Sequence, residues 1–364
     1  MRAFLGFMKK YVPRWALISV ACAALSVIAL LLASVSAPFA DFLNGTIGEA
    51  VRISLAVSSS VLPLSLFEWL LILLIPLTVL FIILRVRRGG GGHPLRTVFS
   101  LIGIIGIIAS SYVFTLGVGY HTTPLADRLS IKEDKDITKE ELYAVAEHLV
   151  GEINSLADGL SFSQSESVMG YSIDDLSREL ASAYGEFLNK YPIFTGYTSR
   201  VKPVMASVVM SDAGITGIYS FFTGEANLNV DYPDYTHPFT AAHELAHQRG
   251  IARENEANFI AFLVCTASSD PYIRYSGYLN MFEYVGSALY RTDRDSYREL
   301  LARLDKGAVA DMRASSAVTA AHKDSWFNKL NDFLNDTYLK ANGTEGVVSY
   351  GYVVRLAVGY YSYL

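Results

Sequence analysis

Three long apolar segments dominate the first third of the chain. Residues 15–36 and 98–118 carry no charged side chain, and a third apolar run over residues 69–84 extends back to about residue 61. A membrane-spanning helix requires roughly 20 mainly apolar residues. The pattern therefore predicts three transmembrane helices, over about 15–36, 61–84 and 98–118, in a membrane domain that covers residues 1–118.

The charges that flank these segments predict their orientation. Arg52 is the only basic residue between the first and the second segment. The flank before the first segment and the flank between the second and the third together contain seven basic residues: Lys9, Lys10, Arg14, Arg85, Arg87, Arg88 and Arg96. Because positively charged flanks stay in the cytoplasm, we expect a multi-pass protein of the cell membrane with a cytoplasmic N-terminus. Three spans then place residues 119–364 on the extracytoplasmic side.

Residues 119–364 have the size and the pattern of one mostly helical domain. Thr138 and Glu141 form a capping box that starts an amphipathic helix, and a second helical pattern covers residues 172–191. From Thr240 onward, most of the chain has helical periodicity. We therefore expect helices to make up most of this domain.

Two shorter segments predict a small sheet. Residues 202–210 are β-branched and apolar enough for a strand, and residues 215–230 alternate like a second strand or a hairpin. Residues 347–364 are mostly apolar and rich in tyrosine, but Arg355 interrupts them. We expect a helix there that docks on the domain or near the membrane surface. The predicted fold class is mainly α, with three transmembrane helices followed by an α+β domain.

Composition supports the division into a membrane domain and a water-exposed domain, and it limits the classes of partner. A mean hydropathy of +0.29 combined with 18% charged residues fits a chain with a membrane part and a water-exposed part. Residues 1–118 contain nine basic and three acidic residues and so have a net charge of +6. Because the whole chain has a net charge of −5, residues 119–364 have a net charge of −11. An acidic domain argues against nucleic acid as a partner. The two cysteines, Cys22 and Cys265, are too few for a cysteine-rich metal site.

The sequence His243-Glu244-Leu-Ala-His247 is the HExxH motif of zincins. Side chains four residues apart share one face of a helix, so both imidazoles can reach one Zn²⁺ ion. Glu244 is placed to act as the general base that takes a proton from the attacking water. The motif therefore predicts a zinc-dependent hydrolase with His243 and His247 as metal ligands.

A third ligand is expected just beyond the motif. Gly250 can end the helix and turn the chain. Metzincins carry their third histidine six residues after the second, and Arg253 occupies that position here, which disfavours that class. Glu254 begins an E-x-x-A-N pattern similar to the third-ligand helix of glutamate zincins. We expect Glu254 to be the third ligand, with Glu256 as the alternative.

Two other groups are candidates for substrate contacts. Arg274 and Tyr275 carry donors suited to stabilising an oxyanion, although a tyrosine-rich stretch also suits packing. The polar residues of the predicted hairpin are candidates either for a substrate-binding edge strand or for an exposed face: Glu225, Asn227 and Asn229.

The stretch FFTGEANLN…PFTAAHELAHQRGIARENEANFIAFLVC…DPYIRYSGYL resembles a family of uncharacterised bacterial membrane proteins that is catalogued as a domain of unknown function. The resemblance covers nearly the whole chain and is densest over residues 215–285. It implies N-terminal membrane spans, a zincin-like HExxH domain and a zinc cofactor. Members are presumed to be zinc metallopeptidases, and the resemblance adds no known substrate.

The sequence thus predicts a membrane-bound zinc metallopeptidase that acts on peptide or protein substrates at the outer face of the cytoplasmic membrane. The alternative is a non-enzymatic zinc-binding sensor or scaffold of the envelope. Glu244 favours the enzyme, because a structural zinc site needs no base. Intramembrane proteolysis is disfavoured, because polar residues such as Gln248 and Arg249 flank the motif.

Overall fold

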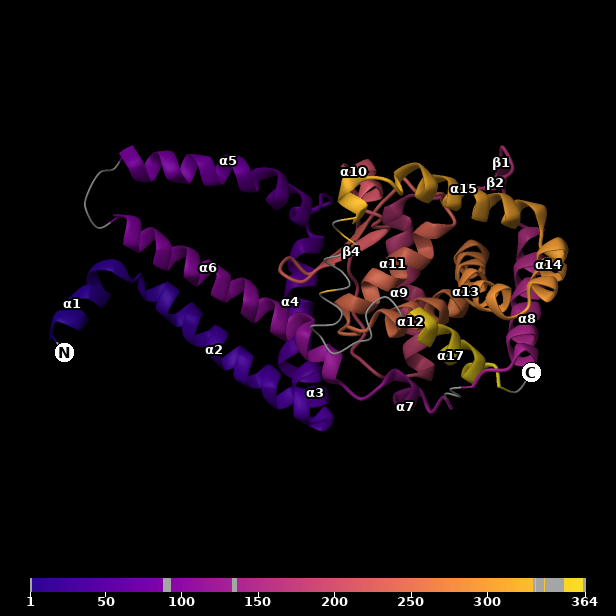
Figure 1. Ribbon diagram of the computed structural model, residues 1–364, viewed down its shortest axis with the longest axis horizontal. Helices are drawn as coiled ribbons and strands as arrows, with labels where there is room; N and C mark the ends of the chain where they lie inside the picture. Colours follow the sequence, from indigo (N-terminus) through magenta and orange to yellow (C-terminus); the bar gives the residue numbers. More distant parts are fainter. Residues whose placement is uncertain are drawn as a thin grey trace.

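The computed structural model describes residues 2–87, 93–132, 136–329, 331, 337 and 350–362. The molecule is elongated, with long helices at one end and a globular domain at the other (Figure 1). The N-terminus lies at the far end from the globular domain (Figure 1). The long helices, preceded by the short helix α1 (Arg2–Tyr11), are α2 (Arg14–Val35), α5 (Leu66–Arg87) and α6 (His93–Thr115).

Among the residues that the structure describes, two helices are long and apolar enough to be candidate membrane spans, not the predicted three. They are Arg14–Val35 and Pro94–Thr115, and the described part of α5 also contains a shorter apolar segment, Leu66–Phe81. The predicted second span began at about residue 61, but residues 61–65 form a turn that contains Pro63, so the helix starts later. Helix α5 as a whole covers Leu66–Arg87, which is 22 residues.

Small residues bring α2 and α6 together. A Cβ atom on Gly103 would lie 2.7 Å from the Ala16 side chain, and one on Gly106 would lie 2.8 Å from Ser19 Oγ. Ser19 Oγ also donates a hydrogen bond of 2.5 Å to the Gly103 carbonyl. Close backbone contact of this kind is typical of helix pairs in membranes. By contrast, the side chains of residues 69–80 in α5 are all exposed.

The segment between α2 and α5 is helical. It contains α3 (Ala37–Leu43), a π-helical turn (Asn44–Gly48) and α4 (Glu49–Ser60), which lie between the long helices and the globular domain (Figure 1). Arg52 is buried in this segment, where its guanidinium donates to the side chain of Asn44 at 2.8 Å and to its backbone carbonyl at 2.7 Å. The single basic residue of the predicted outer loop is therefore a structural residue.

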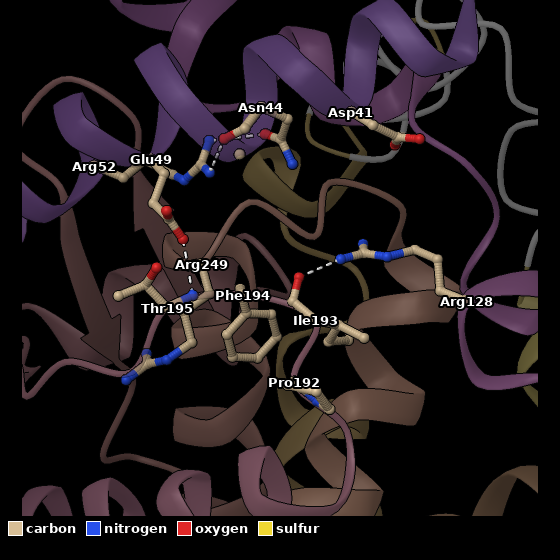
Figure 2. A pocket seen from close by; sticks show the side chains of 11 residues that line it. Asp41, Asn44, Glu49, Arg52, Arg128, Pro192, Ile193, Phe194, Thr195 and Arg249 are labelled. Atoms are coloured by element: carbon tan, nitrogen blue, oxygen red, sulfur yellow. Dashed lines mark hydrogen bonds between the residues drawn. The ribbon is translucent and has the colours of Figure 1, made fainter.

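These short helices also form one wall of a pocket of about 540 Å³ (Figure 2). Figure 2 shows hydrogen bonds among the residues that line it: Glu49 accepts one of 2.8 Å from the backbone of Thr195, and Arg128 donates one of 2.5 Å to the carbonyl of Ile193. These contacts fix the chain around residue 195 to α4. The pocket is a structural junction, and it contains none of the HExxH residues.

Helices surround the core of the globular domain. The predicted capping box is present, because Thr138 Oγ1 accepts from the Glu141 N–H and the Glu141 carboxylate accepts from the Thr138 N–H. Ser172 caps the second predicted helix in the same way. The helices outside the motif region are α7 (Leu125–Leu129), α8 (Lys139–Ala157), α9 (Ile173–Lys190), α10 (Ser207–Asp212), α13 (Pro271–Thr292), α14 (Arg294–Arg303), α15 (Lys306–His322) and α17 (Tyr350–Tyr360).

Helix α17 docks on the globular domain. Val353, Leu356 and Ala357 are buried in the main hydrophobic core, together with residues of α8, α12 (Glu254–Ala267) and α13. This confirms the predicted docked helix. Residues 347–349 and 363–364 of the predicted segment lie outside the described residues.

The predicted small sheet has three strands in the order β3-β5-β4: β3 (Val201–Pro203), β5 (Glu225–Leu228) and β4 (Gly217–Ser220). β4 and β5 form the predicted hairpin, and β3 runs parallel to β5. The strand predicted over residues 202–210 is much shorter, because the chain turns away after Pro203. There the Glu68 carboxylate accepts hydrogen bonds from the N–H groups of Met205 and Ala206. A second, two-stranded hairpin joins β1 (Phe162–Ser163) to β2 (Glu166–Ser167).

Buried polar contacts join this sheet to the start of α5. Lys202 and Glu225 have fully buried side chains and form an ion pair of 3.4 Å. The Glu225 carboxylate also accepts hydrogen bonds from the N–H groups of Leu66 and Phe67, at 3.0 and 2.8 Å. A carboxylate at this place satisfies free donors of the first helical turn. The sheet therefore fixes the point at which α5 leaves the globular domain.

Candidate metal centre

The HExxH motif lies on the buried helix α11 (Thr236–Gln248). His243 and His247 share one face of this helix, and their ring centroids are 4.6 Å apart. The hairpin β4–β5 packs against the same helix. A buried helix beside a sheet holds both imidazoles in fixed positions.

A left-handed glycine ends α11. Gly250 has φ +91°, and the N–H of Ile251 donates back to the Ala246 carbonyl at 3.1 Å, which closes a Schellman-type turn. The turn brings the Ile251 carbonyl to 2.7 Å from Nδ1 of His247. With the Nδ1 proton donated to this carbonyl, Nε2 keeps its lone pair for a metal ion.

Glu254, the first residue of α12, completes the cluster. Its carboxylate oxygens lie 3.3 Å from His243 Nε2 and 3.6 Å from His247 Nε2. One ligand atom from each of the three residues lies within 4.8 Å of the others. Two atoms bound tetrahedrally to one zinc ion at about 2 Å are separated by about 3.3 Å. The donor types and their spacing therefore fit a zinc ion.

The alternative ligand, Glu256, has another role. Its Oε1 accepts hydrogen bonds from the Leu125 N–H at 2.9 Å and from the Arg253 guanidinium at 2.8 Å. These bonds direct its carboxylate to α7 and away from the histidines. Of the two acids left open by the sequence, the structure brings Glu254 to the cluster.

Burial and charge together set the protonation of the site. Burial lowers the pKa of His247, but the Glu254 carboxylate outweighs this effect and raises the pKa to about 9. Burial opposes ionisation of Glu254, yet the two histidines hold its pKa well below its usual range. Burial raises the pKa of Glu244.

Glu244 is held between its helix and the edge strand. It is only 5% exposed, and a Cβ atom added to Gly217 would lie 2.6 Å from its Oε1. Only glycine leaves room for the carboxylate at this point of β4. The opposite edge of β4 pairs with no other strand in the part of the chain that the structure describes. An unpaired edge next to Glu244 is suited to bind an extended peptide by strand addition.

The cluster lines a cleft of about 710 Å³. The cleft includes Glu283 of α13, which the sequence analysis missed. Burial raises the pKa of Glu283 to about 7, although the Tyr235 hydroxyl donates to it at 3.1 Å. The sequence signal that could have identified Glu283 is its acidic side chain within the apolar pattern MFEYV. Further lining residues are Tyr112, Leu116, Tyr120, Gly217, Ile218, Tyr219, Asn280 and Tyr284.

A comparison with protein-family models assigns the chain to a family. Residues 46–358 match the family described as "Protein of unknown function (DUF3810)". The chain belongs to the DUF3810 family. The match includes α4, α5 and α6 together with the globular domain, so it crosses the boundary predicted between residues 118 and 119. No curated protein and no solved structure matches the chain.

In this DUF3810 protein, Arg274 and Tyr275 are not brought to the cleft. The Tyr275 side chain is fully buried, and its hydroxyl donates to Asp311 at 2.7 Å. The Arg274 guanidinium lies 3.6 Å from Glu152 of α8. Both residues stabilise the packing of α13, so the geometry does not support the predicted oxyanion role.

The polar residues of the hairpin also do not lie on an edge strand, where the substrate-binding interpretation would place them. Glu225 and Asn227 lie on β5, the central strand, and both are buried. Glu225 caps α5, and Asn227 accepts a hydrogen bond of 2.7 Å from Ser65. Asn229, just beyond the strand, is buried too. The free edge belongs to β4, whose Gly and Ile residues carried no polar signal in the sequence.

We predict that changes to the metal ligands abolish zinc binding. His243→Ala, His247→Ala and Glu254→Gln should each lower the affinity for zinc by at least about 100-fold, the upper end of what loss of a supporting residue costs. Glu256→Gln is the matched control, because an amide oxygen still accepts the hydrogen bonds of that site. Elemental analysis and zinc titration of the purified variants measure the effect. Equal zinc loss in Glu254→Gln and Glu256→Gln would contradict the ligand assignment.

Proposed function

We propose that this protein is a membrane-bound zinc metallopeptidase of the glutamate-zincin type that cleaves peptide or protein substrates. One observation carries the proposal. His243, His247 and Glu254 converge within 4.8 Å in a cleft that also contains the buried carboxylate of Glu244. A purely structural zinc site is closed by a fourth protein ligand and has no use for an adjacent base.

Each residue then has a defined role. A bound zinc ion would supply Lewis acidity toward a carbonyl oxygen and lower the pKa of water to about 7. Glu244 takes a proton from the attacking water and delivers it to the leaving nitrogen. The Ile251 carbonyl keeps His247 in the tautomer that binds metal, and the free edge of β4 aligns an extended substrate beside Glu244.

The membrane anchor is part of the proposal. The two candidate spans α2 and α6 both approach the globular domain at their C-terminal ends, and α5 connects the domain end back to the far end (Figure 1). If α2 and α6 cross the bilayer, α5 must cross it as well, because the chain has to return before α6 begins. Three crossings, together with the seven basic residues in the two sequence flanks that would then be cytoplasmic, support an extracytoplasmic catalytic domain.

The proposed activity is tested with the full chain purified in detergent. It should cleave members of a randomised peptide library, lose this activity in a zinc chelator and regain it when zinc is restored. Cleavage products are identified by mass spectrometry. Cleavage that persists in the chelator, or a zinc-loaded protein that cleaves no member of the library, would contradict the proposal.

We predict that the globular domain faces the outside of the cell. In a Cys22→Ser background, a cysteine at the exposed position Ser182 of α9 should react with a membrane-impermeant maleimide in intact cells. The exposed Lys10→Cys near the N-terminus should react only after the membrane is opened, and the remaining Cys265 is buried. The reverse labelling pattern would place the site in the cytoplasm.

A further inference from the structure

The metal cleft opens beside the end of a candidate membrane span. Tyr112 lies in the last turns of α6, and Leu116 follows the helix directly. Both line the same cleft as His243 and Glu244. Because α6 approaches the globular domain with this end (Figure 1), one wall of the cleft is formed by the part of α6 that emerges from the proposed bilayer.

The free edge strand runs from the catalytic carboxylate to this same helix end. Gly217, at the start of β4, contacts Glu244. Phe221, just after the end of β4, is bound by α6: its carbonyl accepts hydrogen bonds from Ser111 Oγ at 2.7 Å and Thr115 Oγ1 at 3.1 Å. Four residues of extended chain cover roughly 13 Å. A peptide paired along β4 therefore needs about four residues between α6 and the catalytic carboxylate.

Another rim of the cleft adjoins a segment that is held at the start of α5. Gly214 and Ile215, which line the cleft, follow α10, whose Val208 and Val209 are more than half exposed. The Glu68 carboxylate at the start of α5 holds the N-terminal end of this segment. Exposed apolar side chains beside the start of a long apolar helix suit the lipid interface.

Helix α5 does not share the close packing that joins α2 to α6. α2 and α6 pack closely, but the side chains of residues 69–80 in α5 are exposed. The start of α5 is tied to the tip of the β4–β5 hairpin, where the rings of Phe67 and Phe222 are 5.8 Å apart. An apolar segment lying between α5 and α6 would leave the bilayer at this hairpin and meet the free edge of β4.

We infer that the substrates are membrane-anchored polypeptides, cleaved within a few residues of the point where they leave the bilayer. The inference rests on the proposed function and its membrane anchor, and adds the class of substrate. The apolar anchor lies beside α5 and α6, and the adjoining extended segment pairs with β4. The reaction is hydrolysis: water adds to the scissile carbonyl, the C–N bond breaks, and the proton passes to the new amine.

The test uses the full chain in lipid nanodiscs with three matched probes. All carry the same randomised ten-residue segment. The first joins it to a Leu/Ala transmembrane helix through about four residues, the length set by β4. The second uses a rigid helical spacer of about 20 residues, which holds the segment roughly 30 Å from the membrane. The third is soluble and has no anchor.

We expect the short-spaced probe to be cleaved at least about tenfold faster than the rigid-spaced probe, because only the former holds the segment at the cleft. Equal cleavage of the short-spaced and rigid-spaced probes, or of the short-spaced and soluble probes, would overturn the inference while the proposed peptidase activity stands. Cleavage should disappear in Glu244→Gln in every arm.

If no probe is cleaved, that result counts against the proposed function. The inference about the substrate class can then still be tested by measuring binding. A photo-crosslinking amino acid replaces Tyr112 in the Glu244→Gln protein, and the control places it at Leu25, which is 66% exposed on α2. Crosslinking of the short-spaced probe at Tyr112 and not at Leu25 supports entry of an anchored segment. No crosslink at Tyr112, or equal crosslinking at both positions, overturns it.

Discussion

Glu244→Gln is expected to lower peptide hydrolysis by at least about 100-fold, the lower end of what general base catalysis contributes. The amide keeps the shape of the carboxylate but cannot take the proton from water. Glu244 is buried against Gly217 and lies outside the group of three metal ligands, so zinc content and melting temperature should remain close to those of the wild type. Initial rates on a cleaved library peptide, measured with zinc analysis on the same samples, test this.

The same variant separates an enzyme from a zinc-stabilised scaffold. His247→Ala removes the metal, whereas Glu244→Gln removes only the base. If the protein is a scaffold, a cellular phenotype should be lost in His247→Ala and retained in Glu244→Gln. If it is a peptidase, the two variants should be equally defective. Retained function in a zinc-loaded Glu244→Gln protein would rule out the proposed mechanism.

Glu225→Ala is expected to destabilise the protein by about 3–5 kcal/mol, the usual cost of leaving one partner of a buried ion pair alone. Lys202 would lose its carboxylate partner in a fully buried position, and the N–H groups of Leu66 and Phe67 would lose their acceptor. Burial already lowers the pKa of Lys202, and Glu225 opposes this shift. Thermal unfolding of the full chain in detergent measures the loss.

Two controls test whether the loss of stability comes from breaking a buried ion pair. Lys202→Met combined with Glu225→Gln removes both charges and should cost clearly less than Glu225→Ala alone. Glu140→Ala removes the partner of Lys139 in an exposed ion pair, and should change stability by no more than about 1 kcal/mol. A wild-type melting temperature in Glu225→Ala would show that the junction between α5 and the sheet does not stabilise the fold.

Features encoded by neighbouring residues were predictable from the sequence. The capping box of Thr138 and Glu141 depends on residues three apart, and so does the cap at Ser172. The HExxH histidines needed only the period of a helix to be placed on one face. For the same reason the docked helix near the C-terminus and the β4–β5 hairpin were recognisable from their patterns.

The bounds of the second predicted span depended on where a helix begins. The charge-free pattern around residue 61 did not reveal that Pro63 lies in a turn, nor that the carboxylate of Glu225, about 160 residues away along the chain, caps α5. A helix start set by a distant acceptor leaves little local signal. The role of Glu225 itself was hidden for the same reason, because its partners belong to a separate segment.

The sequence alone determined the metal motif, and the tertiary structure decided how the site is completed. Residues two apart on a helix point about 200° away from each other, so Glu254 and Glu256 cannot both face the histidines. Which of them does so depends on how α12 is rotated, and Arg253 and the N–H of Leu125 fix that rotation by binding Glu256. Which strand edge lies unpaired beside Glu244 was decided in the same way, since the order of the described strands places β4 at the edge of the sheet. Short-range periodicity specifies which side chains can act together, and long-range packing selects the ones that do.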